Sequence, residues 1–300
     1  VGSSSAFALM QSGLFSEMVL IDADTNRAEG EAMDISHGIS FARPMQIYAG
    51  SYDDIADAAI IVIPAGANQK PGETRLDLIK KNAAIMKSIV GEIKKRDFGG
   101  ILLIVSNPVD ILTLIALKES GYPANRVIGS GTVLDTGRFK YLLGEHLAID
   151  SRSVHAFIIG EHGDSELAAW SNATIGGLSV NEFCELRGHF NHEASMKRIF
   201  DDVKNSAYEI IERKHATYYG IAMAVKRICE AIVRNEKSIL PVSSLMTGEY
   251  GLNDVVLSIP SVVGETGVEK VVPIGLNDDE MSELRKSADI LKNIAADYIS

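Results

Sequence analysis

The first half of the chain alternates short apolar runs with longer stretches that carry a helical stripe of apolar residues. Of all the features of the sequence, this alternation limits the possible folds most. Residues 59–63 and 101–105 are continuously apolar, as strands covered by helices on both faces are. Residues 75–96 and 109–120, which follow these runs, have the spacing of helices. The alternation predicts an α/β protein built on a doubly wound parallel sheet of the Rossmann type, in which ligands bind beyond the carboxyl ends of the strands.

The second half of the chain has a different pattern. Helical stripes at residues 134–146, 196–211 and 218–233 are followed by strand-like segments at 239–246, 254–259 and 268–274 and by a final helix from residue 277. We interpret the strand-like segments as antiparallel strands. We therefore expect a Rossmann-type domain at residues 1–128 and a mixed α+β domain at residues 129–300.

The charge and cysteine content exclude several classes of partner. The chain has 29 basic and 40 acidic residues, a net charge of −11, and no Lys/Arg stripe, so nucleic acid is not an expected partner. No apolar run approaches the roughly 18 residues of a membrane span. The two cysteines, Cys184 and Cys229, lack the spacing of metal ligands, so we expect free thiols in a reducing, cytoplasmic compartment and no metal site.

Gly2 and Asp22 have the spacing of two residues in a dinucleotide-binding unit. In such a unit a glycine-rich turn places the pyrophosphate on a helix N-terminus, and an acid about 20 residues later binds the ribose hydroxyls. Asp22 lies 20 positions after Gly2, at the end of an apolar run. The pair fits an ordinary helix start and strand-end acid equally well. An acid at this position favours NAD over NADP, because a 2′-phosphate would meet a like charge.

Other polar residues follow the predicted strands directly. His162 comes after residues 155–159, which are apolar from Ala156 on, and an imidazole at a strand end is held firmly enough to donate and accept a proton. Asn107 follows the strand at 101–105. Residues 64–75 form a loop longer than an ordinary strand–helix connection, which favours a loop that closes over a site. An isolated histidine is more often a satisfied structural residue, so its role depends on the rest of the chain.

Asp135 and Arg138 are three residues apart on one face of a predicted helix. Alone, such a pair is usually a solvated salt bridge. Together with His162, the pair supplies most of what hydride transfer between a nicotinamide and a 2-hydroxy or 2-oxo acid requires. That reaction needs a proton carrier for the oxygen, a bidentate cation for the carboxylate and a second cation that polarises the carbonyl.

Specific motifs extend this interpretation to a family. They are residues 68–75 (Asn-Gln-Lys-Pro-Gly-Glu-Thr-Arg), 106–110 (Ser-Asn-Pro-Val-Asp), 129–138 (Gly-Ser-Gly-Thr-Val-Leu-Asp-Thr-Gly-Arg) and 159–164 (Ile-Gly-Glu-His-Gly-Asp). With these motifs the sequence resembles the L-lactate/malate dehydrogenase family over essentially its whole length. The resemblance implies NAD as the cofactor, pyruvate and L-lactate as substrates, an NAD-binding domain at residues 1–128 and a catalytic domain at residues 129–300.

The resemblance also implies a role for each residue at a matching position. His162 would donate a proton to the carbonyl oxygen, and Asp135 would be its carboxylate partner. Arg138 would clamp the substrate carboxylate, and Arg75 would polarise the carbonyl once the loop has closed. The other matches surround the substrate and the nicotinamide ring, or bind the rest of the cofactor: Asn107, Thr217 and Ile221, and Gly2 and Asp22.

Gln69 separates the two branches of the family. Malate dehydrogenases have an arginine at this position for the second carboxylate of their substrate, whereas the neutral amide of Gln69 suits a methyl group. A dicarboxylate would bury an unpaired charge here. The resemblance therefore implies lactate and pyruvate as substrates. Malate or another 2-hydroxy acid is the alternative, since the neighbouring Lys70 could partly serve as the cation.

Lys140 and His155 match an effector site of the family. Bacterial members often bind fructose 1,6-bisphosphate between subunits, with basic residues at these two positions. The usual residue at the first position is arginine, and lysine lacks its bidentate fork. His155 could equally be a strand-start residue without a special role. The resemblance also implies a homotetramer.

The beginning of the chain differs from the family pattern. Family members begin with a strand and a Gly-x-Gly-x-x-Gly turn, and this sequence begins at the last glycine of that turn, Gly2. The strand would lie in the middle of the sheet, and without it two neighbouring strands would lack a partner. We therefore expect the natural polypeptide to continue upstream.

Overall fold

The computed structural model describes residues 1–67 and 75–299, with the side chains of residues 75 and 299 outside that description. Strands and helices alternate in the first part of the chain, which confirms the predicted α/β fold. In chain order the elements are α1 (Gly2–Ser12), β1 (Glu17–Leu20), α2 (Thr25–His37), β2 (Gln46–Ala49), β3 (Ile60–Ile63), α3 (Arg75–Lys94), β4 (Ile101–Ile104), α4 (Val109–Ser120) and β5 (Val127–Gly129).

The larger sheet combines both halves of the chain. β3, β4 and β5 pair in parallel. β12 (Ser243–Thr247) and β13 (Asn253–Ser258) extend the sheet beyond β5 with antiparallel pairing, which gives the order β13-β12-β5-β4-β3. The parallel strands β1 and β2 form a separate two-stranded sheet. The predicted parallel strands are therefore divided between two sheets, and the second half of the chain completes the larger one.

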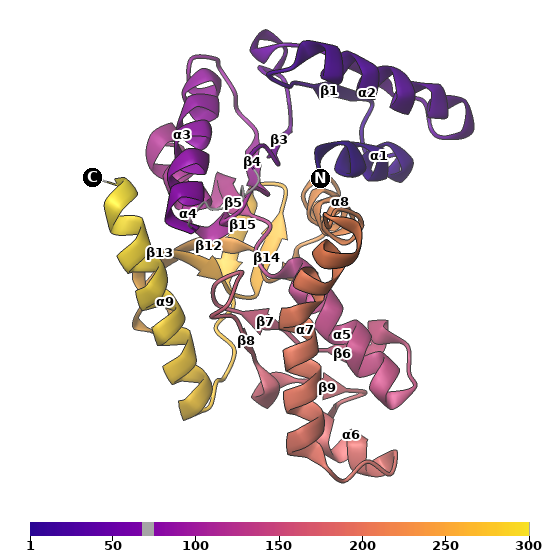
Figure 1. The fold of residues 1–300 in the computed structure, drawn as a ribbon, viewed down its shortest axis with the longest axis vertical. Helices are drawn as coiled ribbons and strands as arrows, with labels where there is room; N and C mark the ends of the chain where they lie inside the picture. Colours follow the sequence, from indigo (N-terminus) through magenta and orange to yellow (C-terminus); the bar gives the residue numbers. More distant parts are fainter. Residues whose placement is uncertain (68–74, 300) are drawn as a thin grey trace.

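β4 lies at the centre of the core. Successive side chains of a strand point to opposite faces. Leu102 and Ile104 accordingly pack with α3, α4 and α9 (Asp278–Ile299), and Ile101 and Leu103 pack with α1 and α8 (Tyr219–Val233). All four side chains are at most 3% exposed. Figure 1 shows the two groups of helices on opposite sides of this sheet, and burial on both faces explains why the run is apolar throughout.

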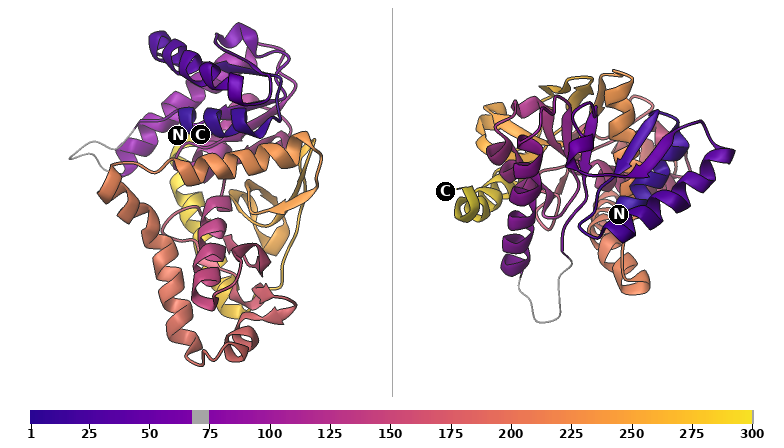
Figure 2. Two further views of the ribbon diagram at one scale, coloured as in Figure 1. Left: turned by 90° about the vertical axis from the view of Figure 1, so that its right-hand side faces the viewer. Right: turned by 90° about the horizontal axis from the view of Figure 1, so that it is seen from above.

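The second part of the chain builds smaller sheets among long helices. Its further elements are α5 (Val133–Leu147), β6 (Val154–His155), β7 (Ile158–Ile159), β8 (Leu167–Ala168), β9 (Thr174–Ile175), β10 (Leu178–Ser179), α6 (Val180–Leu186), α7 (His192–Lys214), β11 (Ser238–Leu240), β14 (Ser261–Gly264) and β15 (Gly267–Val271). α2 lies at one end of the long axis of the molecule and α6 at the other (Figures 1 and 2). Among the described residues, none of the helices is both long and apolar enough to cross a membrane.

Two predicted strands are interrupted in the structure. The run that leads to His162 divides into β6 and β7, which belong to different sheets. On one side of β7 the N–H of Ile158 donates to the hydroxyl of Thr136, and its C=O accepts from the hydroxyl of Thr132. α5 and the residue that precedes it therefore take bonds that a neighbouring strand would otherwise make. The predicted strand at 239–246 divides at Pro241, which has no N–H to continue a ladder.

Candidate active site

After β7, each of residues 160–162 is held by backbone hydrogen bonds to another element. Gly160 exchanges two backbone hydrogen bonds of 2.9 Å with Ser258 at the end of β13. The N–H of the following residue donates to Ser287 Oγ on α9 at 2.8 Å, and the N–H of His162 donates to Asp110 Oδ2 on α4 at 2.8 Å. Gly160 has a φ of 90°, which favours glycine. The segment at the end of the strand, which was predicted to hold His162 firmly, is therefore bonded to β13, α9 and α4.

Asp135 lies between His162 and Arg138. Its Oδ2 is 2.6 Å from His162 Nδ1, and its Oδ1 accepts a hydrogen bond from Arg138 Nη1 at 2.8 Å. The side chain of Asp135 is 3% exposed and that of Arg138 is 14% exposed, so this pair is not the solvated salt bridge that its spacing alone suggests. Because an ionised Asp135 accepts the Nδ1 proton, Nε2 is the ring nitrogen that can face a substrate.

The charges of the site favour an imidazolium beside a carboxylate. Burial by itself lowers the pKa of His162, but the charge of Asp135 and its hydrogen bond outweigh burial. With smaller contributions from Asp110 and Glu166, they raise the pKa of His162 to about 9. Burial raises the pKa of Asp135, and the charges of His162 and Arg138 more than reverse this effect, so the pKa is lowered and the carboxylate stays ionised.

Two buried acids beside this pair have no role predicted from the sequence. Asp110, which is 2% exposed, accepts hydrogen bonds from the His162 N–H and the Ser243 hydroxyl, and burial raises its pKa to about 6 against those bonds. Glu166, which is 5% exposed, has a carboxyl oxygen within 4.8 Å of ligand atoms of both Asp135 and His162. The motif at residues 106–110 contains Asp110 and could have pointed to it. No comparable signal marks Glu166.

Asn107 lies beyond the carboxyl end of β4, as predicted, and a second asparagine connects it to the next loop. The side-chain N–H of Asn82 on α3 donates to the carbonyl of Asn107 at 2.8 Å. The side-chain oxygen of Asn82 accepts from the N–H of Ala67 at 2.8 Å. Asn82 is 3% exposed and thus joins the end of β4 to the segment after β3. Gln69 and the side chain of Arg75 lie outside the described residues.

The start of α8 packs closely against the start of α5. A Cβ built on Gly220 would lie 2.9 Å from Leu134 Cδ1, so a larger residue there would require the Leu134 side chain to shift. Thr217 and Ile221, both half-buried, flank this contact. The packing brings Gly220, the neighbour of Ile221, beside the residue that precedes Asp135.

The residues predicted to bind the cofactor form a suitable set of donors and acceptors. Among the described residues, no side chain caps the N-terminus of α1, and its first turn contains no acid, so its N–H groups suit a phosphate. Gly2 in this turn packs against Pro64 after β3, where an added Cβ would lie 3.4 Å from Pro64 Cγ. The exposed carboxylate of Asp22 lies beyond the carboxyl end of β1 and accepts the N–H of Asp24 at 3.0 Å. A helix N-terminus for phosphate and an acid for hydroxyls fit a dinucleotide.

The predicted effector residues lie on neighbouring elements. Lys140 is on α5 and His155 is on β6, and these two elements pack together. Burial lowers the pKa of Lys140, and His155 is exposed.

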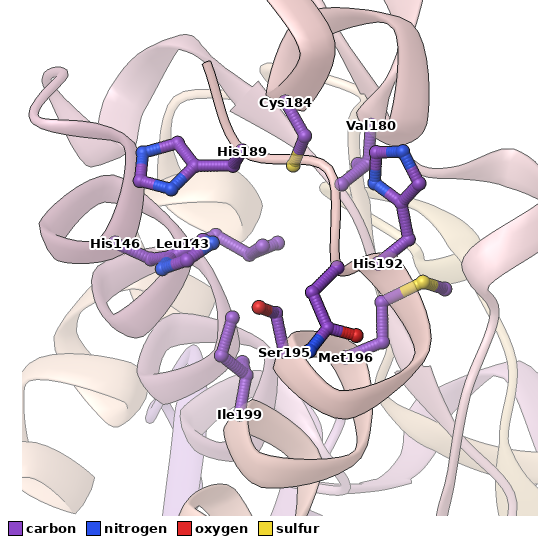
Figure 3. A pocket seen from close by; sticks show the side chains of 10 residues that line it. Leu143, His146, Val180, Cys184, His189, His192, Ser195, Met196 and Ile199 are labelled. Atoms are coloured by element: carbon purple, nitrogen blue, oxygen red, sulfur yellow. The ribbon is translucent and has the colours of Figure 1, made fainter. Parts of the chain in front are cut away.

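A separate cavity lies between α5, α6 and α7. Figure 3 shows the imidazoles of His146, His189 and His192 and the thiol of Cys184 around it. Its volume of about 10 Å³ is the room of one water molecule, which is too small for a 2-oxo acid. Among the described residues, His146 Nε2 and His192 Nδ1 are buried without a hydrogen-bond partner.

Two protein-family models together match almost the whole chain. The first, described as lactate/malate dehydrogenase, NAD binding domain, matches residues 1–129, and the second, described as lactate/malate dehydrogenase, alpha/beta C-terminal domain, matches residues 132–299. The chain belongs to the lactate/malate dehydrogenase family. The first match is to the family's NAD-binding domain, so NAD is the cofactor.

Known lactate/malate dehydrogenases are similar over nearly the full length of the chain. L-lactate dehydrogenase of Acetivibrio thermocellus is 55% identical over 294 residues, which are 98% of this chain and 93% of that protein. L-lactate dehydrogenase 1 of Clostridium acetobutylicum is 56% identical, over 97% of this chain and 93% of that protein. A crystal structure of the minor L-lactate dehydrogenase of Enterococcus mundtii in its ligand-bound form has a TM-score of 0.96 at 46% identity and covers 99% of this chain and 94% of that one.

Proposed function

We propose that this chain is an NAD-dependent L-lactate dehydrogenase, which interconverts L-lactate and pyruvate. The 2.6 Å contact between His162 Nδ1 and Asp135 Oδ2, with Arg138 on the same carboxylate, carries the proposal. The similar proteins named above are all L-lactate dehydrogenases, which supports this substrate pair over malate and oxaloacetate.

The proposed mechanism uses His162 as the carrier of the transferred proton. When NADH is bound, it supplies the hydride that forms the new C–H bond at C2 of pyruvate. The Nε2 proton of His162 moves to the carbonyl oxygen, which becomes the hydroxyl of lactate, and the same nitrogen takes this proton back in lactate oxidation. Asp135 keeps its charge throughout and stabilises the imidazolium through Nδ1.

The other proposed roles concern the position of the substrate. Arg138 binds its carboxylate with two parallel N–H···O bonds, and the bond to Asp135 orients the guanidinium for this task. Arg75, at the start of α3, polarises the carbonyl. Asn107 holds the nicotinamide and the substrate oxygen. The pocket wall consists of Thr217, Ile221 and Gln69, and the neutral amide of Gln69 selects a methyl group over a second carboxylate.

Further proposals concern the whole molecule. Residues 1–128 bind NAD, with Gly2 and Asp22 at the pyrophosphate and the ribose, and residues 129–300 supply the catalytic groups. The buried, free Cys184 and Cys229 support a cytoplasmic enzyme.

We also propose a homotetramer. Three exposed apolar side chains are candidates for its interfaces: Phe41, Leu186 and Phe190, which are 94%, 72% and 73% exposed.

An NADH-oxidation assay with pyruvate, oxaloacetate and a branched 2-oxo acid tests the function. We expect kcat/KM for pyruvate to exceed that for oxaloacetate by about 10²-fold or more, because the second carboxylate would be buried without a partner. Faster turnover of oxaloacetate would instead assign the chain to the malate branch. Turnover of none of these acids would contradict the proposed function.

Fructose 1,6-bisphosphate is expected to lower the half-saturating pyruvate concentration. Lys140 and His155 would hold its phosphates, and a bound effector stabilises the conformation that binds substrate better. The measurement is a pyruvate saturation curve with and without the bisphosphate. The variant Lys140→Ala should keep the basal curve and lose the response. An unchanged saturation curve for the wild-type protein would contradict the proposed activation.

A further inference from the structure

Glu166 is buried next to the catalytic pair, although the proposed mechanism gives it no role. Its residue is 5% exposed, and one of its carboxyl oxygens lies within 4.8 Å of an oxygen of Asp135 and of a ring nitrogen of His162. Its backbone N–H donates to the carbonyl of Gly163 at 3.1 Å, which closes the turn after His162. Three ionisable groups at this separation in a buried site cannot titrate independently.

The charged groups around Glu166 come from three parts of the fold. α5 contributes Asp135 and Arg138, the segment after β7 contributes His162, and α7 contributes Lys204. Lys204 also donates to the carbonyl of Asp164 at 3.1 Å, so α7 is attached to the same turn. The three cations favour the carboxylate of Glu166, whereas burial and the negative Asp135 favour its neutral form.

The balance of these effects leaves Glu166 neutral at neutral pH. Burial, followed by the charge of Asp135, raises the pKa of Glu166 to about 8, with His162, Lys204 and Arg138 opposing them. The acid therefore ionises in the pH range just below the one in which His162, with its pKa of about 9, loses its proton. Asp110 and Asp135 also face His162, so the carboxylate of Glu166 adds to negative charge already present there.

We propose that Glu166 is a positioning residue for His162, whose ring nitrogen lies within 4.8 Å of its carboxyl group, and that its ionisation at alkaline pH keeps the transferable proton on His162. This inference rests on the proposed function. Below about pH 8 the acid is neutral and adds no charge. Above that pH its carboxylate stabilises the imidazolium. Pyruvate reduction requires the imidazolium, so kcat/KM for pyruvate falls as the pH rises through the pKa of His162, and Glu166 moves this fall to higher pH.

The variant Glu166→Gln tests the inference through the pH dependence of pyruvate reduction. At pH 7 we expect kcat/KM within about twofold of wild type, because glutamine resembles the neutral acid in size and hydrogen bonding. The alkaline fall should move to lower pH by roughly one unit, because the stabilising charge can no longer form. Glu166→Asp, which keeps the acid, should restore part of this shift.

A matched control is Glu209→Gln on α7, whose side chain is 60% exposed and paired with Arg213. This change also removes one negative charge but should leave the pH profile unchanged.

Chemical modification of the full chain without substrate gives a second measurement that does not depend on turnover. Diethyl pyrocarbonate acylates a histidine in its neutral form and not as the imidazolium. The pH dependence of His162 modification, followed by mass spectrometry, therefore reports the protonation of this residue. Glu166→Gln should show the same downward shift by this method. Superimposable profiles for wild type and variant, or an equal loss of activity at every pH, would overturn the inference. A wild-type protein that does not reduce pyruvate would refute the proposed function instead, and the modification profiles would still test the role of Glu166.

Discussion

Replacing His162 by asparagine is expected to lower kcat for pyruvate reduction by about 10³-fold. Asparagine has no group that can donate a proton and recover it at neutral pH, so the hydride would have to arrive before the oxygen is protonated. The bond from Arg138 to Asp135 remains in the variant, which keeps the buried carboxylate paired. Steady-state kinetics with pyruvate and NADH measures the effect.

Two controls distinguish the loss of the proton carrier from damage to the fold. The variant His37→Asn removes an exposed imidazole at the end of α2 and should behave like wild type. The melting temperature and NADH affinity of His162→Asn should stay close to the wild-type values, because its backbone N–H still donates to Asp110. Turnover equal to wild type would exclude His162 as the proton carrier.

Replacing Arg138 by lysine is expected to reduce kcat/KM for pyruvate by about 10²-fold, mainly through a higher KM. Lysine keeps the positive charge but not the planar fork, so the substrate carboxylate loses one of two charge-assisted hydrogen bonds, each worth roughly 1.5–3 kcal/mol. The side chain is 14% exposed, so water replaces the lost bond poorly. Pyruvate saturation curves at fixed NADH measure the change.

The matched control is Arg152→Lys, which alters an arginine that also binds an aspartate. Arg152 pairs with Asp150 but is 90% exposed, and an exposed pair contributes little. Its kinetics should not change. If Arg138→Lys kept the wild-type KM, the substrate carboxylate would have to bind elsewhere.

The fold could be predicted where the periodicity of apolar residues is strong. The run at residues 101–105 corresponds to β4, which is buried on both faces, and the helical stripes correspond to α3, α4, α5, α7 and α8. The division of the run at 155–159 into β6 and β7 could not be predicted in this way. It depends on hydroxyl groups of Thr132 and Thr136, which are distant in sequence and replace a strand as hydrogen-bond partners.

The candidate site was predictable to the extent that its chemistry is local. Asp135 and Arg138 share a helix face, and His162 follows a strand, so their residue types and spacing indicated a common task. The contact between His162 and Asp135, which are 27 residues apart, could be predicted only from the resemblance to a family. The burial of Glu166 beside them was not predictable, because it depends on α5 and α7 closing over the turn after β7.

The anchoring of residues 160–162 also limits how this protein can diverge. Inserting or deleting one residue there would break the register of the bonds to β13, α9 and α4 together. The length of this segment is therefore constrained. The substrate specificity of related proteins can therefore change while the position of the His162 imidazole stays the same.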